Sequence, residues 1–386
     1  MYLAPIKRDS SQRHSTSELA MDKSCKESVL AGFQRIMPET RSRIIKSPFI
    51  LMGFFCIAIL IFIVRLRPKS CTNLNDRRID RMCTENSDHC FNVYVAKLPM
   101  REKDVVVRVL AYDGRQKLRA GLIGDTAVLI RPPGGEEGPD GISRCPDFRK
   151  WLADHSAFVT PYIASMVAAT FVMKSLSLHE NDKDKQVLAL GLGGGSFDMG
   201  LHRIKPHVNI TAVELEPVVM KLASKWFGVV DSGTHHTVLQ DGIKFVDESI
   251  SQGRKYDVVA LDACGELSDT VICPAKPFQN LDTLEKIKNI LTPTGSLVVN
   301  LLSMDRSAYG DYGWTKVLKL FQSVFKTCVL LAMHSTTNTV VACTPFSFPY
   351  IPNLMEYFGN RLSAVISTLH LNVIDNRPYI TLLSAK

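Results

Sequence analysis

Strands and helices alternate along the chain from Lys185 onward, and this alternation constrains the fold more than any other feature. Apolar, β-branched runs predict strands at 186–190, 207–213, 237–239, 256–261 and 295–301. Helices fit between them at 197–204, 217–226, 242–251 and 281–291. This order is typical of a parallel sheet with crossover helices.

The chain continues with a predicted helix at 313–325 and two β-rich runs at 328–333 and 337–343, joined by a short polar link. Such a link favours an antiparallel hairpin. We therefore expect an α/β fold with a seven-stranded Rossmann-like sheet that ends in a C-terminal hairpin. A sheet of the nicotinamide-binding type would instead be parallel throughout.

A glycine-rich loop joins the first strand to the first helix, with four glycines in the five positions 191–195. Glycines let the chain turn sharply and let a ligand approach the backbone, while the following helix offers free N–H groups to an anion. Gly191, Gly193 and Gly195 are therefore candidate cofactor-binding residues. NAD, FAD and S-adenosylmethionine sites all share this pattern, so it does not choose among them.

Carboxylates follow the next three strands. Glu214 lies 23 residues beyond Gly191, where a carboxylate can accept both ribose hydroxyls, and Glu216 is an alternative for this role. Asp241, followed by Gly242, ends the third strand, where an acceptor suits an adenine amino group, and Asp262 ends the fourth. Open α/β sheets bind ligands at the carboxyl ends of their strands. The sequence thus predicts a nucleoside site.

Residues 185–303 resemble the class of S-adenosylmethionine-dependent methyltransferases that includes the spermidine synthases. The resemblance is closest to the C-terminal half of the elongation factor 1-alpha lysine and N-terminal methyltransferase family, and it covers roughly residues 90–345. It rests on residues 154–156, 191–195, 212–217, 225–228, 240–242, 256–258, 273–278 and 291–301. The resemblance implies a methyltransferase sheet, which closes with a hairpin strand.

The resemblance also implies roles for the candidate residues. The three glycines would wrap the methionine part of S-adenosylmethionine, Glu214 would bind the ribose, and Asp241 the adenine amine. Asp262 falls where spermidine synthases place the carboxylate that removes a proton from the attacking amine. An ammonium has no lone pair, so attack on the sulfonium carbon requires a base or a site that favours the neutral amine. No metal is expected in the site.

The chain departs from the aminopropyltransferases within this class. They typically carry a second Asp followed by Pro shortly after the first, whereas this chain reads Asp262-Ala-Cys-Gly-Glu266. Residues 154–162 replace their Tyr-rich, acidic polyamine-binding segment. We therefore favour methyl transfer to an amine, such as a protein lysine, an N-terminus or a small amine. Polyamine aminopropyl transfer and a non-catalytic binding module stay open as alternatives.

An uncharged, almost wholly apolar run extends from Ser47 to Val64. Its 18 residues just suffice to cross the hydrocarbon of a bilayer. The polar leader of 46 residues is too long for a signal peptide, so we expect a single transmembrane helix at 47–66. Lys and Arg flank both ends of the run, which leaves the compartment of the C-terminal domain open.

These features divide the chain into a flexible basic tail (1–46), the transmembrane helix, a juxtamembrane segment (67–89), a small β-rich subdomain (90–150) and a methyltransferase-like Rossmann domain (151–386). Short β-rich runs at 91–95, 105–112 and 126–130 define the subdomain, and 151–176 is predicted to be mainly helical with a break near Pro161. Disulfides are expected among Cys71, Cys83, Cys90 and Cys145, with the pairing open.

The formal charge of +8 is shared equally between the tail and the rest of the chain. Beyond residue 46 the basic and acidic residues number 37 and 33, so the sequence gives little reason to expect a nucleic-acid partner. The oligomeric state is open, with a homodimer as one candidate. Cys264 and Cys273 are interpreted as structural thiols, and His155, His235 and His236 as surface or packing residues.

Overall fold

The computed structural model describes part of the chain, and all of that part lies within one compact unit, Ser70–Lys386. No helix in this part is long and apolar enough to span a membrane. The predicted tail (1–46) and transmembrane helix (47–66) fall outside the described residues, as do Cys71 and Cys145. The described residues are 77–85, 89–100, 104–113, 126–134, 146–266, 268–303, 315–332, 338–349, 351–374 and 379–383.

The larger sheet has nine strands in the order β14-β12-β13-β11-β9-β6-β7-β8, with β10 paired to β11. Strands β6 to β9 and β11 run parallel, and β13 pairs antiparallel with β11 and with β12, so the predicted closing hairpin is confirmed. The strands are β6 (Gln186–Leu190), β7 (Asn209–Glu214), β8 (His235–Leu239), β9 (Tyr256–Leu261), β10 (Val271–Cys273), β11 (Leu291–Ser303), β12 (Thr327–Ala332), β13 (Thr339–Thr344) and β14 (Tyr379–Leu383).

The expected count of seven strands was wrong by two. Strand β10 has only three residues, which is too short for an alternation of apolar and polar residues to be recognised. Strand β14 lies beyond the last predicted element and pairs antiparallel with β12, so its partner is distant in sequence. Strand β14 adds an edge to the sheet and β10 pairs with the end of β11, so the order of the predicted strands is unchanged.

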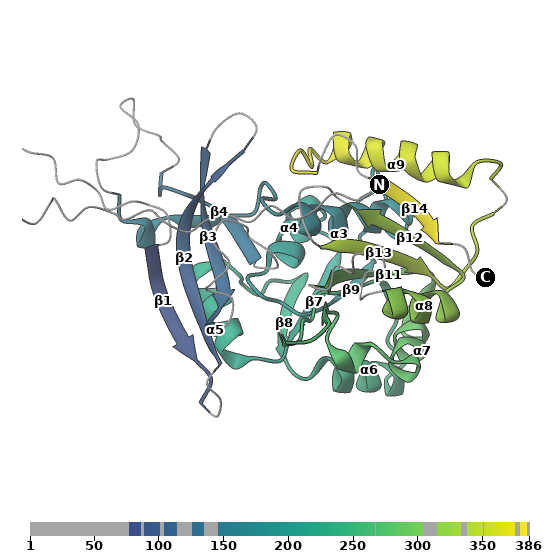
Figure 1. Ribbon diagram of the computed structural model, residues 1–386. Coiled ribbons are helices and arrows are strands. Elements are labelled where there is room, and N and C mark those ends of the chain that lie inside the picture. The colour runs from purple at the N-terminus through teal and green to yellow at the C-terminus, as the bar shows by residue number, and fades with distance from the viewer. Residues whose placement is uncertain are drawn as a thin grey trace, which may run out of the picture. The chain divides into compact units, whose positions relative to one another are not determined.

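Helices cover both faces of this sheet, because successive strand residues point to opposite sides. In β6, Val187 and Ala189 join one core while Leu188 and Leu190 join the other. Figure 1 shows α6, α7 and α8 grouped together and α9 running beside β14. One face packs α3 (Pro161–Val172), α4 (Ser196–Ile204), α5 (Pro217–Trp226) and α9 (Leu354–Thr368); the other packs α6 (Gly242–Ser251), α7 (Leu281–Asn289) and α8 (Thr315–Val324).

The region 151–176 is less helical than predicted. Helix α3 begins only at Pro161, which suits a first helical position, and Leu152–Asp154 forms a short strand, β5. Eleven residues of α3 are buried. The helix contacts α4, α9, β11 and β13, which explains why it is apolar on all sides.

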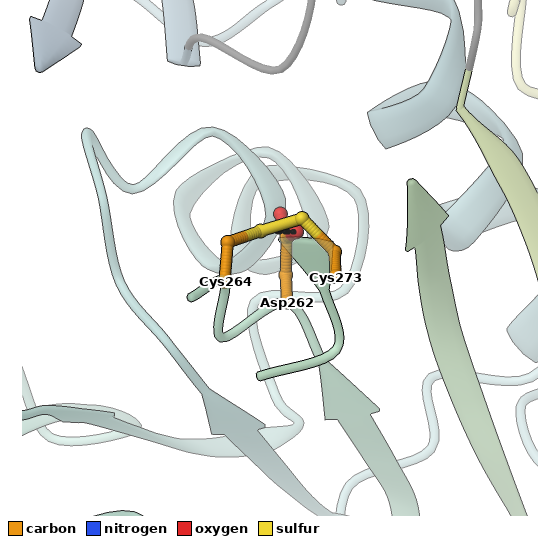
Figure 2. Close-up of side chains that lie close together, drawn as sticks. All are labelled: Asp262, Cys264 and Cys273. Atoms are coloured by element: carbon orange, nitrogen blue, oxygen red, sulfur yellow. Dashed lines mark hydrogen bonds between the residues drawn. A yellow bond between two sulfur atoms is a disulfide. The ribbon is translucent and has the colours of Figure 1, made fainter. Parts of the chain in front are cut away.

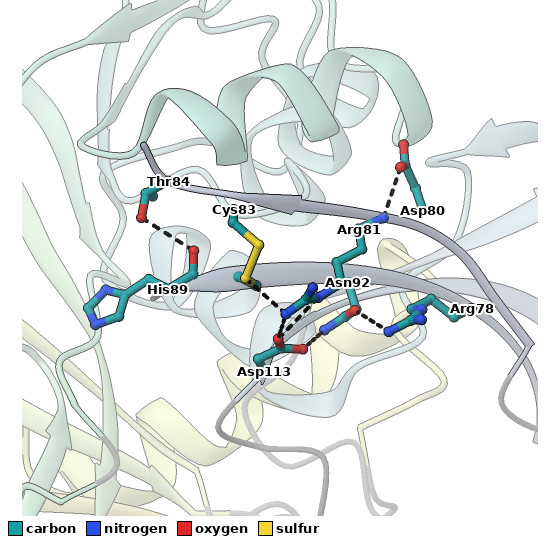
Figure 3. Close-up of a disulfide and its surroundings, with 9 residues drawn as sticks. Arg78, Asp80, Arg81, Cys83, Thr84, His89, Asn92 and Asp113 are labelled. Carbon is teal, nitrogen blue, oxygen red and sulfur yellow. Dashed lines mark hydrogen bonds and ion pairs between the residues drawn. A yellow bond between two sulfur atoms is a disulfide. The ribbon is translucent and has the colours of Figure 1, made fainter. Parts of the chain in front are cut away.

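The smaller sheet is antiparallel, in the order β1-β2-β3-β4-β5, and confirms the predicted β-rich runs. Its first strand falls within the segment predicted as juxtamembrane. A disulfide between Cys83 and Cys90 joins β1 to β2, and Asp113 accepts a hydrogen bond from Arg81 (2.7 Å) beside it (Figure 3). The strands are β1 (Arg77–Cys83), β2 (Cys90–Pro99), β3 (Asp104–Tyr112) and β4 (Thr126–Arg131).

Polar contacts fix the smaller sheet against the larger one. The buried guanidinium of Arg108 donates to the carbonyl oxygens of Phe148 and Trp151, at 2.9 Å each, and to that of Trp226 at the end of α5. The hydroxyl of Ser196, at the start of α4, donates to the carbonyl oxygen of Ala127 in β4 (2.9 Å). Strand β4 is thereby held beside the glycine-rich loop.

Candidate cofactor and active site

The glycine-rich loop connects β6 to α4 and approaches the backbone of a neighbouring loop. Gly191 has a φ of +101°, and a Cβ atom placed there would lie 2.6 Å from the carbonyl oxygen of Asp262. Gly193 has a φ of +55°, and its Cβ would lie 2.6 Å from the hydroxyl of Thr126. Gly195 is the N-cap residue of α4. A side chain would clash at the first two positions, so the loop keeps a bare backbone there.

Glu214 ends β7, and its carboxylate turns back to the glycine-rich loop. It accepts hydrogen bonds from the backbone N–H groups of Leu192 (3.1 Å) and Gly193 (3.3 Å), and its other oxygen accepts from Glu216 (2.9 Å). Burial raises the pKa of Glu214 above its usual range, and the hydrogen bonds from backbone amides offset part of that rise. Glu214 therefore ties the end of β7 to the loop.

Asp241 follows β8 and caps helix α6. Its Oδ1 accepts from the backbone N–H groups of Ile243 (2.7 Å) and Lys244 (3.3 Å), and Gly242 is the first helical residue. A capping aspartate satisfies amides that would otherwise lack partners. The cap holds the side chain at the carboxyl edge of the sheet, next to the strand that carries Glu214.

Asp262 follows β9, and its side chain is held by residues distant in sequence. Its Oδ1 accepts a hydrogen bond from the Nδ2 of Asn300 in β11 (2.7 Å), and its backbone N–H donates to Leu190 (2.9 Å). A disulfide between Cys264 and Cys273 passes beside the carboxylate (Figure 2). A small pocket opens between Asp262 and the glycine-rich loop, lined also by Thr126, Met166 and Phe197.

The candidate residues thus follow four strands that are adjacent in the sheet, β9, β6, β7 and β8. Gly191, Glu214 and Asp262 come together around one loop. Asp241 follows β8, the strand next to the one that ends at Glu214. The geometry is that of the crevice in which open α/β sheets bind ligands.

Parts of the chain are similar to known proteins. No family model matches the chain. It is 30% identical over 165 residues to the "eEF1A lysine and N-terminal methyltransferase homolog" of Drosophila melanogaster, covering 42% of this chain and 24% of that protein. It is 29% identical over 143 residues to the polyamine aminopropyltransferase of Vibrio vulnificus (strain CMCP6), covering 34% and 46%. The matched parts of this chain are thus similar to S-adenosylmethionine-dependent methyltransferases and to spermidine synthase-like enzymes.

This chain spans only part of the length of the relatives that it matches. The chain matches only about a quarter of the Drosophila relative. Among solved structures, human Methyltransferase-like protein 13 in complex with SAH is 26% identical and covers 55% of this chain and 93% of that one, with a TM-score of 0.47.

The structure brings residues to the candidate site that the sequence did not predict. Asn300 lies within the run 291–301 that carries the resemblance, but its apolar surroundings gave no sign of a polar role. Asn338 donates a hydrogen bond to Asn300 (2.9 Å). Thr126 reaches the loop from the smaller sheet. Each of these contacts joins segments far apart in the chain, so no local sequence pattern predicts it.

The cysteines beside Asp262 prove to be bonded to each other. Within the described residues, Asp262, Cys264 and Cys273 form the one group whose ligand atoms lie close enough to hold a metal ion. Two of the three ligand atoms are the sulfurs of the disulfide. The two cysteines therefore form a covalent cross-link across the loop after β9 and are not arranged as metal ligands.

The histidines serve packing, as interpreted from the sequence. His235 is fully buried, and its Nε2 bonds Asp198 (2.6 Å) beneath the start of α4. Burial opposes protonation of His235, but the hydrogen bond and charge of Asp198 outweigh it and raise its pKa. His155 bonds the carbonyl oxygen of Phe227 (2.7 Å), and burial lowers its pKa. Both histidines therefore have hydrogen-bond partners within the fold.

Proposed function

We propose that this chain is an S-adenosylmethionine-dependent methyltransferase that acts on an amine of a protein, such as a lysine or an N-terminus. The observation that carries the proposal is the close approach of Gly191 to the backbone of Asp262. It places the candidate base directly beside the loop that would hold the methionine part of the cofactor. The names of the sequence relatives support the same reaction class.

The described residues fit the cofactor. Gly191, Gly193 and Gly195 stand where a Cβ atom would clash with neighbouring protein atoms, and Gly191 lines the pocket beside Asp262. Glu214 supplies carboxylate oxygens for the ribose hydroxyls, and Asp241, followed by Gly242, supplies an acceptor for the adenine amine. When bound, S-adenosylmethionine supplies an electrophilic methyl group on a sulfonium.

Asp262 performs the acid–base part of this chemistry. An amine substrate arrives mostly as an ammonium, which has no lone pair to attack with. The Asp262 carboxylate accepts one proton from it, and positioned bases of this kind typically contribute a rate factor of about 10²–10⁴. The carboxylate is held for this task by Asn300.

Aminopropyl transfer to a polyamine is the second candidate, favoured by the similarity to the Vibrio vulnificus enzyme. A polyamine carries two or more positive charges and needs carboxylate partners. Near Asp262, however, Asp269 already pairs with Lys276 (2.6 Å), and the Cys264–Cys273 disulfide occupies the segment after the base. These contacts favour methyl transfer.

The decisive experiment compares two cofactors and two acceptors. The full-length chain in detergent is titrated by calorimetry with S-adenosylmethionine and with decarboxylated S-adenosylmethionine. It is then assayed for transfer to lysine-containing and N-terminal peptides and to putrescine. We expect saturable binding of S-adenosylmethionine and methylated peptides. Preference for the decarboxylated cofactor and for putrescine would favour the second candidate, and binding of neither cofactor would favour a non-catalytic module.

A membrane anchor at residues 47–66 is part of the proposal. It rests on the uncharged run in the sequence. The side of the membrane decides which proteins the domain can meet. Disulfides are typical of oxidising compartments, and the described residues hold three of them, which favours a luminal domain. We expect the C-terminus to resist protease in sealed microsomes. Digestion from outside would instead place the domain in the cytosol, and extraction by carbonate would argue against the anchor.

A further inference from the structure

Two buried asparagines connect Asp262 to the antiparallel end of the sheet. Asn300 lies in β11 and Asn338 just before β13, and each side chain is about 1% exposed. The Nδ2 of Asn338 donates to the Oδ1 of Asn300 (2.9 Å), and the Nδ2 of Asn300 donates to the Oδ1 of Asp262 (2.7 Å). The three side chains form a continuous hydrogen-bonded series.

The direction of this series follows from chemistry. The two ends of an asparagine amide are distinguished by their partners. An ionised Asp262 can only accept, so the NH2 group of Asn300 must face it. The carbonyl of Asn300 then faces Asn338, which must donate. Reversing either amide would set two oxygens against each other inside the protein.

The strands do not need these amides to pair. Asn300 stands opposite Val340 in the β11–β13 register, and the backbone ladder runs from Leu297 to Leu301 on both sides of it. The neighbours Val299 and Leu301 are apolar and fully buried. Burying two amides here costs free energy unless their hydrogen bonds are satisfied. The hydrogen bond to Asp262 offers a reason for two buried asparagines in this part of the sheet.

We propose that Asn338 and Asn300 are positioning residues that orient the Asp262 carboxylate, with Asn338 acting through Asn300. The inference rests on the proposed function, because it assigns the two asparagines to the base of that reaction. Asn300 fixes one oxygen of Asp262 by a charge-assisted hydrogen bond, and Asn338 fixes the amide orientation of Asn300. The carboxylate is thereby held in one orientation beside the pocket that it lines.

The test uses Asn338→Asp, a nearly isosteric change that replaces a donor by an acceptor. Asn300 must then turn its NH2 group toward residue 338 and present its oxygen to Asp262. We expect kcat to fall about tenfold or more, while the dissociation constant of S-adenosylmethionine, measured by calorimetry, stays within about twofold. Asn300→Leu should have the same signature, since it removes the donor to Asp262.

Ser296→Ala is the matched control. Ser296 also lies buried in β11 and accepts a hydrogen bond from the hydroxyl of Ser175 (2.7 Å), but it sits in the first half of the strand, away from Asp262. We expect it to lower the urea midpoint without lowering kcat. If Asn338→Asp behaves like Ser296→Ala, with reduced stability and unchanged kcat, the positioning role is refuted.

A readout without turnover separates this inference from the proposed function. In urea unfolding, Asn338→Asp should lower the midpoint less when it is made in the Asp262→Asn variant than when it is made in the wild type. The amide introduced at position 262 can donate to the oxygen that the reversed Asn300 presents. This coupling should vanish in an Asn300→Leu background. If the coupling is observed but the wild type transfers no methyl group, the proposed function is overturned and the link among the three side chains stands. Transfer by the wild type without the coupling would overturn the inference.

Discussion

The two halves of the site hold their carboxylates in different ways. Glu214, in the cofactor half, is held by the backbone amides of Leu192, Gly193 and Glu216, two of which belong to the loop it faces. Asp262, in the chemical half, is held by the side chain of Asn300, 38 residues away, and lies beside a disulfide. A backbone amide donates whatever side chain its residue carries, although Gly193 itself has no room for one, whereas a side-chain contact depends on the particular residue. The position of Asp262 therefore depends on more particular side chains than the position of Glu214 does.

The largest expected effect is a loss of turnover without a loss of cofactor binding. Asp262→Asn keeps the shape of the side chain but removes the base, so kcat should fall about 10²–10⁴-fold. The dissociation constant of S-adenosylmethionine should change by less than about threefold. Steady-state kinetics and calorimetry measure the two quantities. Asp247→Asn on α6, where the aspartate pairs with Lys286 at the surface, is the control and should change neither. Full turnover by Asp262→Asn would remove this residue from the mechanism.

The next effect is the converse, loss of binding. Glu214→Ala removes both the acceptors for ribose and the tie to the glycine-rich loop. Hydrogen bonds to a charged group contribute about 1.5–3 kcal/mol each, so the dissociation constant should rise about 100-fold or more. Glu216→Ala is a matched control two residues away, because only the backbone of Glu216 contacts Glu214. A larger loss in Glu216→Ala would transfer the ribose role to that residue.

The same contrast explains what the sequence could predict. The strands β6 and β9 and the helices α5 and α6 match the predicted ranges, because alternating or periodic apolar residues mark them locally. Glu214 and Asp262 were recognisable because they end predicted strands. The partners of Asp262 were not, since a buried Asn300 in a run of Val and Leu carries no periodic signal. Strands β1, β5 and β10 are short or polar and owe their structure to pairing with neighbours.

A smaller effect is expected from pH, which changes the affinity for S-adenosylmethionine by protonating Glu214. Ribose hydroxyls need an ionised acceptor, and the pKa of Glu214 is raised by burial above the usual value for a glutamate. Affinity for S-adenosylmethionine should therefore be full well above this raised pKa and weaken as the pH falls through it, by up to about tenfold per pH unit. Calorimetry across a pH series measures this. Glu214→Gln, which cannot ionise, should bind weakly and without this dependence, and an unchanged slope in that variant would assign the titration to another group.

The smallest effect tests the disulfide of the chemical half. Replacing Cys264 and Cys273 by Ser frees the loop after β9, so the orientation of Asp262 becomes less fixed and kcat should fall about two- to fivefold. The disulfide between Cys328 and Cys343 joins β12 to β13 and provides the control. Loss of a disulfide of either loop length costs about 2–3 kcal/mol of stability, so both double variants should melt earlier. Only the first should lose turnover at a temperature where both are folded. Equal turnover in the two variants would mean that the Cys264–Cys273 bond stabilises the fold and leaves Asp262 to its asparagine partners.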